Sequence, residues 1–407
     1  MDRNLSPAEP ADVGLSAAGL ARIDAALNAL IGQGELAGVV TLAARHGRVV
    51  HRCAQGLRDL ATAEPLTLDT IFRIFSMTKP VTAAAMMILH DEGRWRLEDP
   101  IARFLPAFAD VKVFGGVAQD GRVERLPPDH APTLKELLTH TAGFSYGFDP
   151  ADPVDDLYKA VSPLASGSLT EMAAKLAALP LAYQPGTQWR YSLSMDLQGA
   201  IIEALSGQSL PDFMRTRIFE PLGMVDTAFH VPPDKRRRLA TLYRMSKSRG
   251  LVATDNMIGR DYEAPPALAM GGGGLFSTAA DYARFAQMLL NKGEFGEVRI
   301  LSPEAVALMT ANHLSNEIIG GGFGVGVQTI RPGFGYGFNG AVFTDPALAG
   351  SRVGQGTYQW DGAAGTWFWV DPENDLLYVG LIQRMALPGA PSVQAMTQEM
   401  MAGALVS

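Results

Sequence analysis

The chain has 407 residues, of which 47% are hydrophobic and 19% charged, and this balance excludes a wholly disordered protein. Its 34 basic and 42 acidic residues give a net charge of −8, which argues against binding to nucleic acid or to an anionic membrane surface. A single cysteine excludes an intrachain disulfide. The N-terminus does not read as a signal peptide and no long apolar run occurs, so we expect a cytoplasmic protein without membrane contact.

The first elements are a helix and a pair of strands. Apolar residues at helical spacing predict a helix over 15–31. Two β-rich runs then flank His46-Gly47, which is typical of a hairpin turn. A second helix is predicted over 77–92, and residues 94–260 look mainly helical, with the clearest helices at 133–140 and 196–205.

Beyond Gly271 to Gly274 the pattern changes to strands between helices. A helix is predicted over 279–290, followed by strand-like runs at 323–330, 365–370 and 376–382. The turn at Asp371-Pro-Glu-Asn joins the last two runs into a hairpin, and a final helix spans about 392–404.

This order predicts an α+β fold in which both ends of the chain build one mainly antiparallel sheet flanked by helices. Residues 1–95 together with 261–407 would form the α/β domain, and residues 96–260 a mainly helical domain. We expect the active site in the cleft between them, because such clefts are where sites tend to lie.

The first candidate for chemistry is Ser76-Met-Thr-Lys79, an S-x-x-K motif at a helix start. Residues at i and i+3 share a helix face, so the hydroxyl and the amine can meet, and desolvation can make lysine a general base. Pro80 is tolerated only in the first turn, which places the helix start near Ser76. The Ser76 N–H then has no partner inside the helix and could hold an oxyanion. The alternative is an ordinary helix cap with a surface lysine.

A rival nucleophile is Ser145, in the G-x-S-x-G match Gly143-Phe-Ser-Tyr-Gly147. In α/β-hydrolases this motif lies between a strand and a helix. Here a helix precedes it and Phe148-Asp-Pro follows it, so Ser145 is predicted to be a loop residue.

The remaining patterns predict no bound group. The seven histidines show no metal-binding spacing, and Gly271 to Gly274 lacks the strand and lysine of a phosphate loop. A tight backbone crossing explains the glycines better. We therefore expect neither a metal nor another cofactor.

Several motifs together resemble a known family. The run 72–82 around Ser76 looks like that of class C β-lactamases and of the related family VIII carboxylesterases, within the serine β-lactamase and penicillin-binding protein superfamily. Supporting stretches follow in the right order along nearly the whole chain, at 92–100, 137–143, 183–192, 221–224, 272–282 and 365–374. The resemblance implies the β-lactamase/transpeptidase-like fold.

The resemblance also implies a second motif, Tyr-x-Asn, which here reads Tyr191-Ser192-Leu193. Tyr191 would share proton transfer with Lys79, either as a phenol or as a phenolate favoured by the ammonium. Leu193 stands where an asparagine would bind the side-chain amide of a β-lactam. Leucine cannot make that hydrogen bond.

The third motif, Lys-Thr-Gly, is altered to Trp360-Asp361-Gly362. Trp360 replaces the lysine that would meet a substrate carboxylate, and Asp361 departs from the glycine that often follows such a tryptophan in family VIII esterases. Gly362 would let the backbone approach the substrate, and the Ala363 N–H would complete the oxyanion hole with Ser76. The acyl-enzyme apparatus is thus kept while recognition of an anionic β-lactam is lost.

The sequence therefore predicts a serine carboxylesterase that acts on short, uncharged esters, with acyl transfer as a further activity. Ser76, Lys79 and Tyr191 are the expected catalytic residues, and Tyr146 and Trp360 are expected to line an apolar substrate pocket. The expected partner is a small-molecule ester, and the oligomeric state is left open. The alternatives are a β-lactamase or D,D-peptidase, and a non-catalytic penicillin-binding-like protein.

Overall fold

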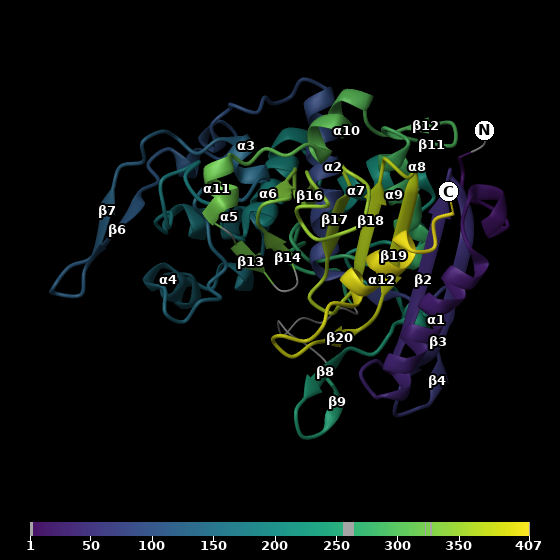
Figure 1. Cartoon of the computed structure of the whole chain (residues 1–407). Helices are drawn as coiled ribbons and strands as arrows, with labels where there is room; N and C mark the ends of the chain where they lie inside the picture. The colour runs from purple at the N-terminus through teal and green to yellow at the C-terminus, as the bar shows by residue number, and fades with distance from the viewer. Residues whose placement is uncertain (1–2, 255–263, 322, 326–327, 407) are drawn as a thin grey trace.

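The central element of the fold is one twisted sheet to which both ends of the chain contribute (Figure 1). The computed structural model describes residues 3–254, 264–321, 323–325 and 328–406. In these residues the strand order is β1-β3-β2-β19-β18-β17-β16-β15, with β4 paired to the far part of β3. The strands are β1 (Ser6–Pro7), β2 (Gly38–Arg45), β3 (Arg48–Asp59), β4 (Glu64–Pro65), β15 (Phe334–Tyr336), β16 (Ala341–Phe343), β17 (Tyr358–Asp361), β18 (Trp367–Asp371) and β19 (Leu376–Leu381).

The sheet pairing is antiparallel except between β1 and β3. Strand β2 from the start of the chain pairs with β19 from its end, so that Val40 lies opposite Leu381. The two hairpins predicted from turn residues are present. At the first, His46 and Gly47 have φ of 53° and 73°, the left-handed backbone that a two-residue hairpin turn requires.

Helices cover both faces of the sheet. Alternate residues of β2 point to opposite faces, so Val39 and Ala43 join the core formed with the two terminal helices, whereas Val40 and Leu42 join the larger core. The terminal helices are α1 (Ala17–Gly32) and α12 (Val393–Ala402). The larger core includes α2 (Thr78–Asp91) and α9 (Ala279–Leu290), which confirms the expected sheet with helices on both sides.

The middle of the chain is rich in helices, as predicted. They are α3 (Leu134–Leu138), α4 (Pro153–Val161), α5 (Leu169–Ala177), α6 (Ser194–Ser206), α7 (Leu210–Met214) and α8 (Glu220–Leu222), with a π-helical turn at Arg215–Phe219. Short 3-10 turns lie at Pro10–Val13, Phe75–Met77, Ile101–Arg103, Pro106–Phe108, Pro163–Ala165 and Pro233–Arg238. Later helices are α10 (Pro303–Thr310) and α11 (Asn316–Gly321). Each helix of the described residues is too short or too polar to span a lipid bilayer.

Small strand pairs were not all predicted. Within the stretch expected to be mainly helical, β6 (Val113–Val117) pairs with β7 (Val123–Leu126), and this hairpin projects from the body in Figure 1. There also β8 (Tyr243–Ser246) pairs with β9 (Gly250–Ala253) and, from the end of the chain, with β20 (Arg384–Met385). The remaining pairs are β5 (Phe72–Arg73) with β10 (Phe276–Ser277), and β11 (Glu294–Phe295) with β12 (Val298–Arg299).

The run 323–330, expected as a single strand, is instead two. Strand β13 (Phe323–Val325) pairs antiparallel with β14 (Gln328–Ile330), and residues 326–327 between them lie outside the described residues. The two halves pair with each other and so satisfy backbone N–H and C=O groups of both strands.

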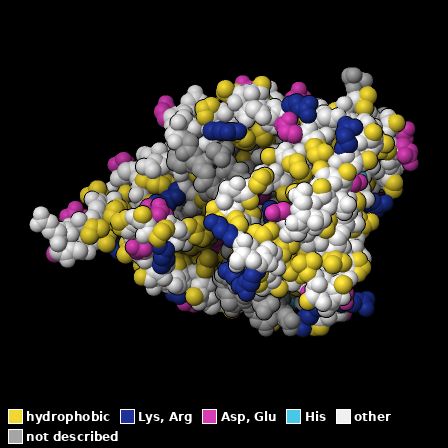
Figure 2. Space-filling model, turned by 60° about the horizontal axis from the view of Figure 1, so that its bottom comes forward, with side chains coloured by type: hydrophobic (Ala, Val, Ile, Leu, Met, Phe, Trp, Pro, Cys, Tyr) yellow, Lys and Arg dark blue, Asp and Glu magenta, His cyan; other side chains and the backbone are white. Residues whose placement is uncertain are grey.

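Charged side chains are mixed over the face seen in Figure 2. Lysines and arginines lie among acidic and hydrophobic side chains rather than in one continuous basic stripe on this face.

Candidate active site

Ser76 lies in a short turn that leads into helix α2. The turn Phe75–Met77 is 3-10 helical, and α2 begins at Thr78, which confirms the helix start predicted from Pro80. Phe75 has φ of 44°, a left-handed conformation that is unusual for a bulky residue and marks local strain. Its ring is held in a small cluster with Leu242 and Ala364. The surrounding structure thus fixes the backbone that carries Ser76.

Two functional groups converge on the hydroxyl of Ser76. The Nζ atom of Lys79 lies 3.1 Å from Ser76 Oγ, and the hydroxyl of Tyr191 donates to the same oxygen over 2.7 Å. Lys79 is one helical turn after Ser76, whereas Tyr191 comes from the loop that precedes α6. The fold therefore brings together the three residues predicted to be catalytic.

The amine of Lys79 is completely buried. It donates to the carbonyl oxygen of Gly272 over 2.6 Å and lies 3.2 Å from the hydroxyl of Tyr146. Burial lowers the pKa of Lys79 to about 7, although the carboxylates of Asp196 and Asp361 act in the opposite direction. Near neutral pH a large fraction of the amine is uncharged and can accept a proton.

Tyr191 stays protonated at neutral pH. Burial raises its pKa well above the usual range, and Asp361 and Asp196 raise it further, while the neighbouring Ser76 hydroxyl and Trp360 side chain act in the opposite direction. Of the two forms considered from the sequence, the neutral phenol fits this environment. The ring of Tyr191 lies 4.5 Å from Lys79 Nζ, close enough to stabilise the ammonium through its π face.

Aromatic rings pack around Tyr191. Trp360 is only 1% exposed, with its ring centroid 5.9 Å from that of Tyr191 and 5.5 Å from that of Tyr336. The buried ring of His140 lies 4.9 Å from Tyr191, and its Nδ1 is 2.9 Å from the hydroxyl of Ser192. Burial and the nearby Lys79 lower the pKa of His140, so this imidazole is neutral. Trp360 is therefore a packing partner of Tyr191.

Tyr146, predicted to line the substrate pocket, contacts Lys79 directly through its hydroxyl. Its ring stacks on Phe148 at 4.7 Å and lies 5.1 Å from the ring of Tyr191. Burial raises the pKa of Tyr146 well above its usual value, so it too is a neutral phenol. Sequence reasoning missed its contact with the amine, because the two residues are 67 positions apart and share no motif.

The end of strand β17 lies against the segment that precedes Ser76. A Cβ atom on Gly362 would approach the Ile74 carbonyl oxygen and Thr366 Oγ1 to 2.3 Å each, so only glycine fits there. Thr366 in turn donates its hydroxyl to Ile74 O over 3.2 Å. Ala363, the next residue, is exposed. The peptide groups of Ser76 and Ala363, both predicted to hold the oxyanion, thus belong to two segments in direct contact.

Ser145 is buried and braces a loop. Its hydroxyl donates to Asp155, whose carboxylate also accepts from Arg190 over 2.7 Å and from the Asp149 N–H over 2.7 Å. Neither a strand nor a helix borders Ser145 directly, in agreement with the loop predicted there. Leu193, which departs from the Tyr-x-Asn motif, is 1% exposed and packs in the large core.

The glycine run marks a tight crossing with helix α6, as predicted. A Cβ atom on Gly271 would lie 2.4 Å from the carbonyl oxygen of Met195, and one on Gly272 would lie 2.6 Å from Asp196 Oδ2. The same Gly272 provides the carbonyl that accepts from Lys79. The crossing therefore contributes a polar group to the site, which the sequence pattern alone did not reveal.

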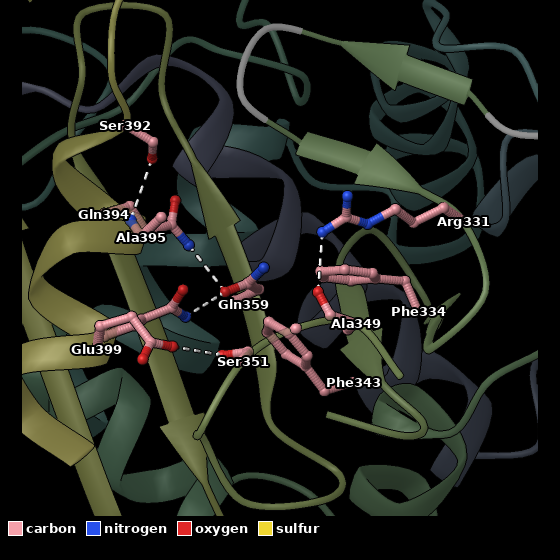
Figure 3. A pocket seen from close by; sticks show the side chains of 12 residues that line it. Arg331, Phe334, Phe343, Ala349, Ser351, Gln359, Ser392, Gln394, Ala395 and Glu399 are labelled. Atoms are coloured by element: carbon pink, nitrogen blue, oxygen red, sulfur yellow. Dashed lines mark hydrogen bonds between the residues drawn. The ribbon is translucent and has the colours of Figure 1, made fainter. Parts of the chain in front are cut away.

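A separate cavity of about 330 Å³ lies on the opposite face of the sheet from Trp360 (Figure 3). Gln359, whose side chain points away from that of its neighbour Trp360, accepts from Gln394 over 2.9 Å and from Gln398 over 2.5 Å. Phe334 and Phe343 form the aromatic part of the cavity wall. This cavity is outside the Ser76 site.

Comparisons with known proteins agree with this geometry. The family model described as Beta-lactamase matches residues 23–398. The chain belongs to the beta-lactamase family. The match spans both parts of the sheet and every residue of the Ser76 site.

Relatives within the beta-lactamase family include Protein Rv1367c from Mycobacterium tuberculosis, which is 40% identical over 86% of each chain. Esterase EstB from Burkholderia gladioli is 32% identical over 88% of this chain and 90% of its own. Among solved structures, EstCE1, described as a hydrolase with promiscuous acyltransferase activity, superposes with a TM-score of 0.76 at 27% identity. That superposition covers 96% of this chain and 99% of EstCE1. The fold is therefore the β-lactamase/transpeptidase-like fold expected from the sequence.

Proposed function

We propose that this beta-lactamase-family protein is a serine carboxylesterase that cleaves short, uncharged esters through an acyl-enzyme on Ser76. The main support for this proposal is the contact of Ser76 Oγ with two groups, the buried amine of Lys79, whose pKa is about 7, and the phenol of Tyr191. The esterase name of EstB and the hydrolase description of EstCE1 support ester hydrolysis.

In the first half of the reaction, the uncharged amine of Lys79 takes the Ser76 proton as Oγ attacks the ester carbonyl carbon. The tetrahedral oxyanion is held by the N–H groups of Ser76 and Ala363. Tyr191 then gives its proton to the departing alkoxide and recovers a proton from the Lys79 ammonium. The alcohol leaves, and Ser76 carries the acyl group.

In the second half, water takes the place of the alcohol. The same pair, Lys79 and Tyr191, removes a proton from water as it attacks the acyl carbonyl, and Ser76 leaves with a proton returned to its oxygen. An alcohol in place of water gives acyl transfer, an activity that the description of EstCE1 supports. No step in this scheme requires a metal or an organic cofactor.

The decisive experiment is labelling with a fluorophosphonate, followed by mass spectrometry of the adduct. We expect phosphonylation of Ser76 and loss of ester hydrolysis in Ser76→Ala. Ser145→Ala is the matched control and should retain activity within about tenfold, or roughly 1.4 kcal/mol. An adduct on Ser145 with Ser76 unmodified would overturn the mechanism.

Pre-steady-state kinetics separates an enzyme from a non-catalytic relative. An acyl-enzyme whose hydrolysis is slower than its formation releases a burst of alcohol product, followed by steady turnover. We expect a burst that scales with enzyme concentration for 4-nitrophenyl acetate. Stoichiometric labelling of Ser76 without steady turnover would instead identify a binding protein with a relic site.

A further inference from the structure

A buried carboxylate, Asp196, is linked to the proposed catalytic lysine through one residue. Asp196 is in the first turn of α6 and has no exposed surface. Its charge raises the pKa of Lys79, and it also raises the pKa of Tyr146 and Tyr191. Burying a charge costs free energy unless hydrogen bonds or an opposite charge compensate it. The burial of Asp196 close to the amine of Lys79 therefore needs a physical explanation.

The geometry connects Asp196 to Lys79 through a single residue. Oδ1 of Asp196 accepts from the Gly272 N–H over 3.1 Å, and the carbonyl oxygen of Gly272 accepts from Lys79 Nζ over 2.6 Å. A Cβ atom on Gly272 would lie 2.6 Å from Asp196 Oδ2 and 2.9 Å from the hydroxyl of Tyr146. Gly272 therefore lies closely between these two side chains, with no room for a side chain of its own.

The carbonyl of Gly272 restricts how the amine can be oriented. A carbonyl oxygen only accepts, so one N–H of Lys79 must point toward Gly272. In the uncharged amine one N–H bond and the lone pair then remain for the Ser76 and Tyr146 hydroxyls. Fixing the Gly272 carbonyl thus helps to direct the lone pair of Lys79 toward Ser76.

Building on the proposed function, we propose that Asp196 is a positioning residue of the active site. It fixes the Gly272 carbonyl that orients the amine of Lys79, and it places a carboxylate one hydrogen-bonded residue away from that amine. The groups that face Lys79 are Asp196 from α6, Asp361 from β17, the phenols of Tyr146 and Tyr191 and the neutral ring of His140.

Two substitutions at Asp196 separate the effect of its charge from the effect of its position. Asp196→Asn keeps an oxygen that can accept from Gly272 but removes the charge, so the pKa of Lys79 should fall. We expect the acid limb of kcat/KM to move down by at least about half a pH unit, with kcat on the plateau nearly unchanged. Asp196→Glu keeps the charge but displaces the carboxylate. It should leave the acid limb in place and lower kcat about 10- to 100-fold without a comparable change in KM.

Asp281→Asn is the matched control. Asp281 is also buried and also accepts from a backbone N–H, that of Asp226 over 2.7 Å, and from the Thr227 hydroxyl over 2.9 Å. Removing its charge should leave the acid limb unchanged. A purely structural role for Asp196 predicts that both Asn variants lose stability alike and that neither moves the pH profile.

The outcomes distinguish this inference from the proposed function. If the wild-type protein is labelled on Ser76 but Asp196→Asn leaves the pH profile unmoved and Asp196→Glu keeps full kcat, only the role of Asp196 is wrong. If Ser76→Ala retains hydrolysis, the proposed function itself fails. Should Asp196→Asn not fold, full kcat in folded Asp196→Glu would by itself overturn the positioning role.

Discussion

The amine of Lys79 loses its proton near neutral pH, because complete burial lowers its pKa. With a pKa of about 7, the amine is protonated below neutral pH and cannot accept the Ser76 proton there. We therefore expect kcat/KM for 4-nitrophenyl acetate to rise with pH through about 7 and then level off. The raised pKa of Tyr191 keeps the phenol protonated over the range in which the ester is stable. A profile that is flat between pH 5.5 and 8.5 would contradict this role of the amine.

The two phenols near Lys79 differ in what they contact. The hydroxyl of Tyr191 donates to the nucleophile itself over 2.7 Å, whereas the hydroxyl of Tyr146 lies 3.2 Å from the amine of Lys79. Tyr191→Phe should therefore lower kcat by at least about 10²-fold, the usual effect of a general acid–base group. Tyr146→Phe serves as the matched variant and should lower kcat less than tenfold. Equal losses in the two variants would assign the proton transfer to both phenols.

At the scale of single residues, the sequence predicted the groups that local geometry connects. Ser76 and Lys79 are one helical turn apart, so their contact follows from helix periodicity. Tyr191 came from the resemblance to a family. The contacts of Lys79 with Tyr146 and Gly272 span 67 and 193 positions, and only the folded chain brings these residues together.

At the scale of elements, the end of strand β17 packs directly against the segment that precedes α2. Gly362 has no space for a side chain, because a Cβ atom would lie 2.3 Å from the Ile74 carbonyl oxygen. Gly362→Ala should push these segments apart and displace the Ala363 N–H from the oxyanion. We expect kcat to fall about 10²-fold for a displacement near 1 Å, with ester binding less affected.

The control for this substitution is Gly32→Ala at the end of α1, where a Cβ atom would meet no other atom within 4 Å. This variant should keep wild-type kcat and thermal stability. If Gly362→Ala retains kcat while its melting temperature falls, the glycine serves packing alone, and the oxyanion arrangement proposed here is wrong.

The elements that the sequence predicted are those with strong local determinants. Helices α2 and α9 have long apolar faces, and the hairpin at His46-Gly47 has the turn residues that left-handed backbone requires. The β6–β7 and β8–β9 pairs escaped prediction because most of their residues are exposed or half-buried, and two glycines interrupt β6. Such strands lack the run of apolar residues that marks a buried strand in the sequence.

At the scale of the whole molecule, β2 and β19 join the two ends of the chain in one sheet, and the end of strand β17 meets the segment that carries Ser76. The sequence predicted this closure because strands occur at both ends and helices between them. The division into residues 1–95 with 261–407 and residues 96–260 stays a prediction. The contacts of Lys79 explain why the middle of the chain matters to the site, since Tyr146, Tyr191 and Asp196 all come from it.

From the charges around the site we expect uncharged esters to be better substrates than β-lactams. Trp360 stands where the lysine of a Lys-Thr-Gly motif would meet a carboxylate, and the neighbouring Asp361 lies close enough to raise the pKa of both Lys79 and Tyr191. A substrate carboxylate placed near Asp361 meets a like charge, which costs several kcal/mol in a partly desolvated site. Leu193, buried in the core, offers no amide for a β-lactam side chain.

We therefore expect kcat/KM for benzylpenicillin to be at least about 10³-fold below that for 4-nitrophenyl butyrate. Because penicillin differs from the ester in more than charge, 4-nitrophenyl hydrogen succinate provides a closer comparison, as it has the same chain length and one added carboxylate. It should be a poorer substrate than the butyrate by at least about tenfold, and Asp361→Asn should narrow that difference. Slow ring opening of nitrocefin is compatible with this account, because the β-lactam ring of this compound opens unusually easily. Penicillin turnover equal to that of the butyrate ester, or a succinate penalty that Asp361→Asn leaves unchanged, would show that charge at Asp361 does not select the substrate.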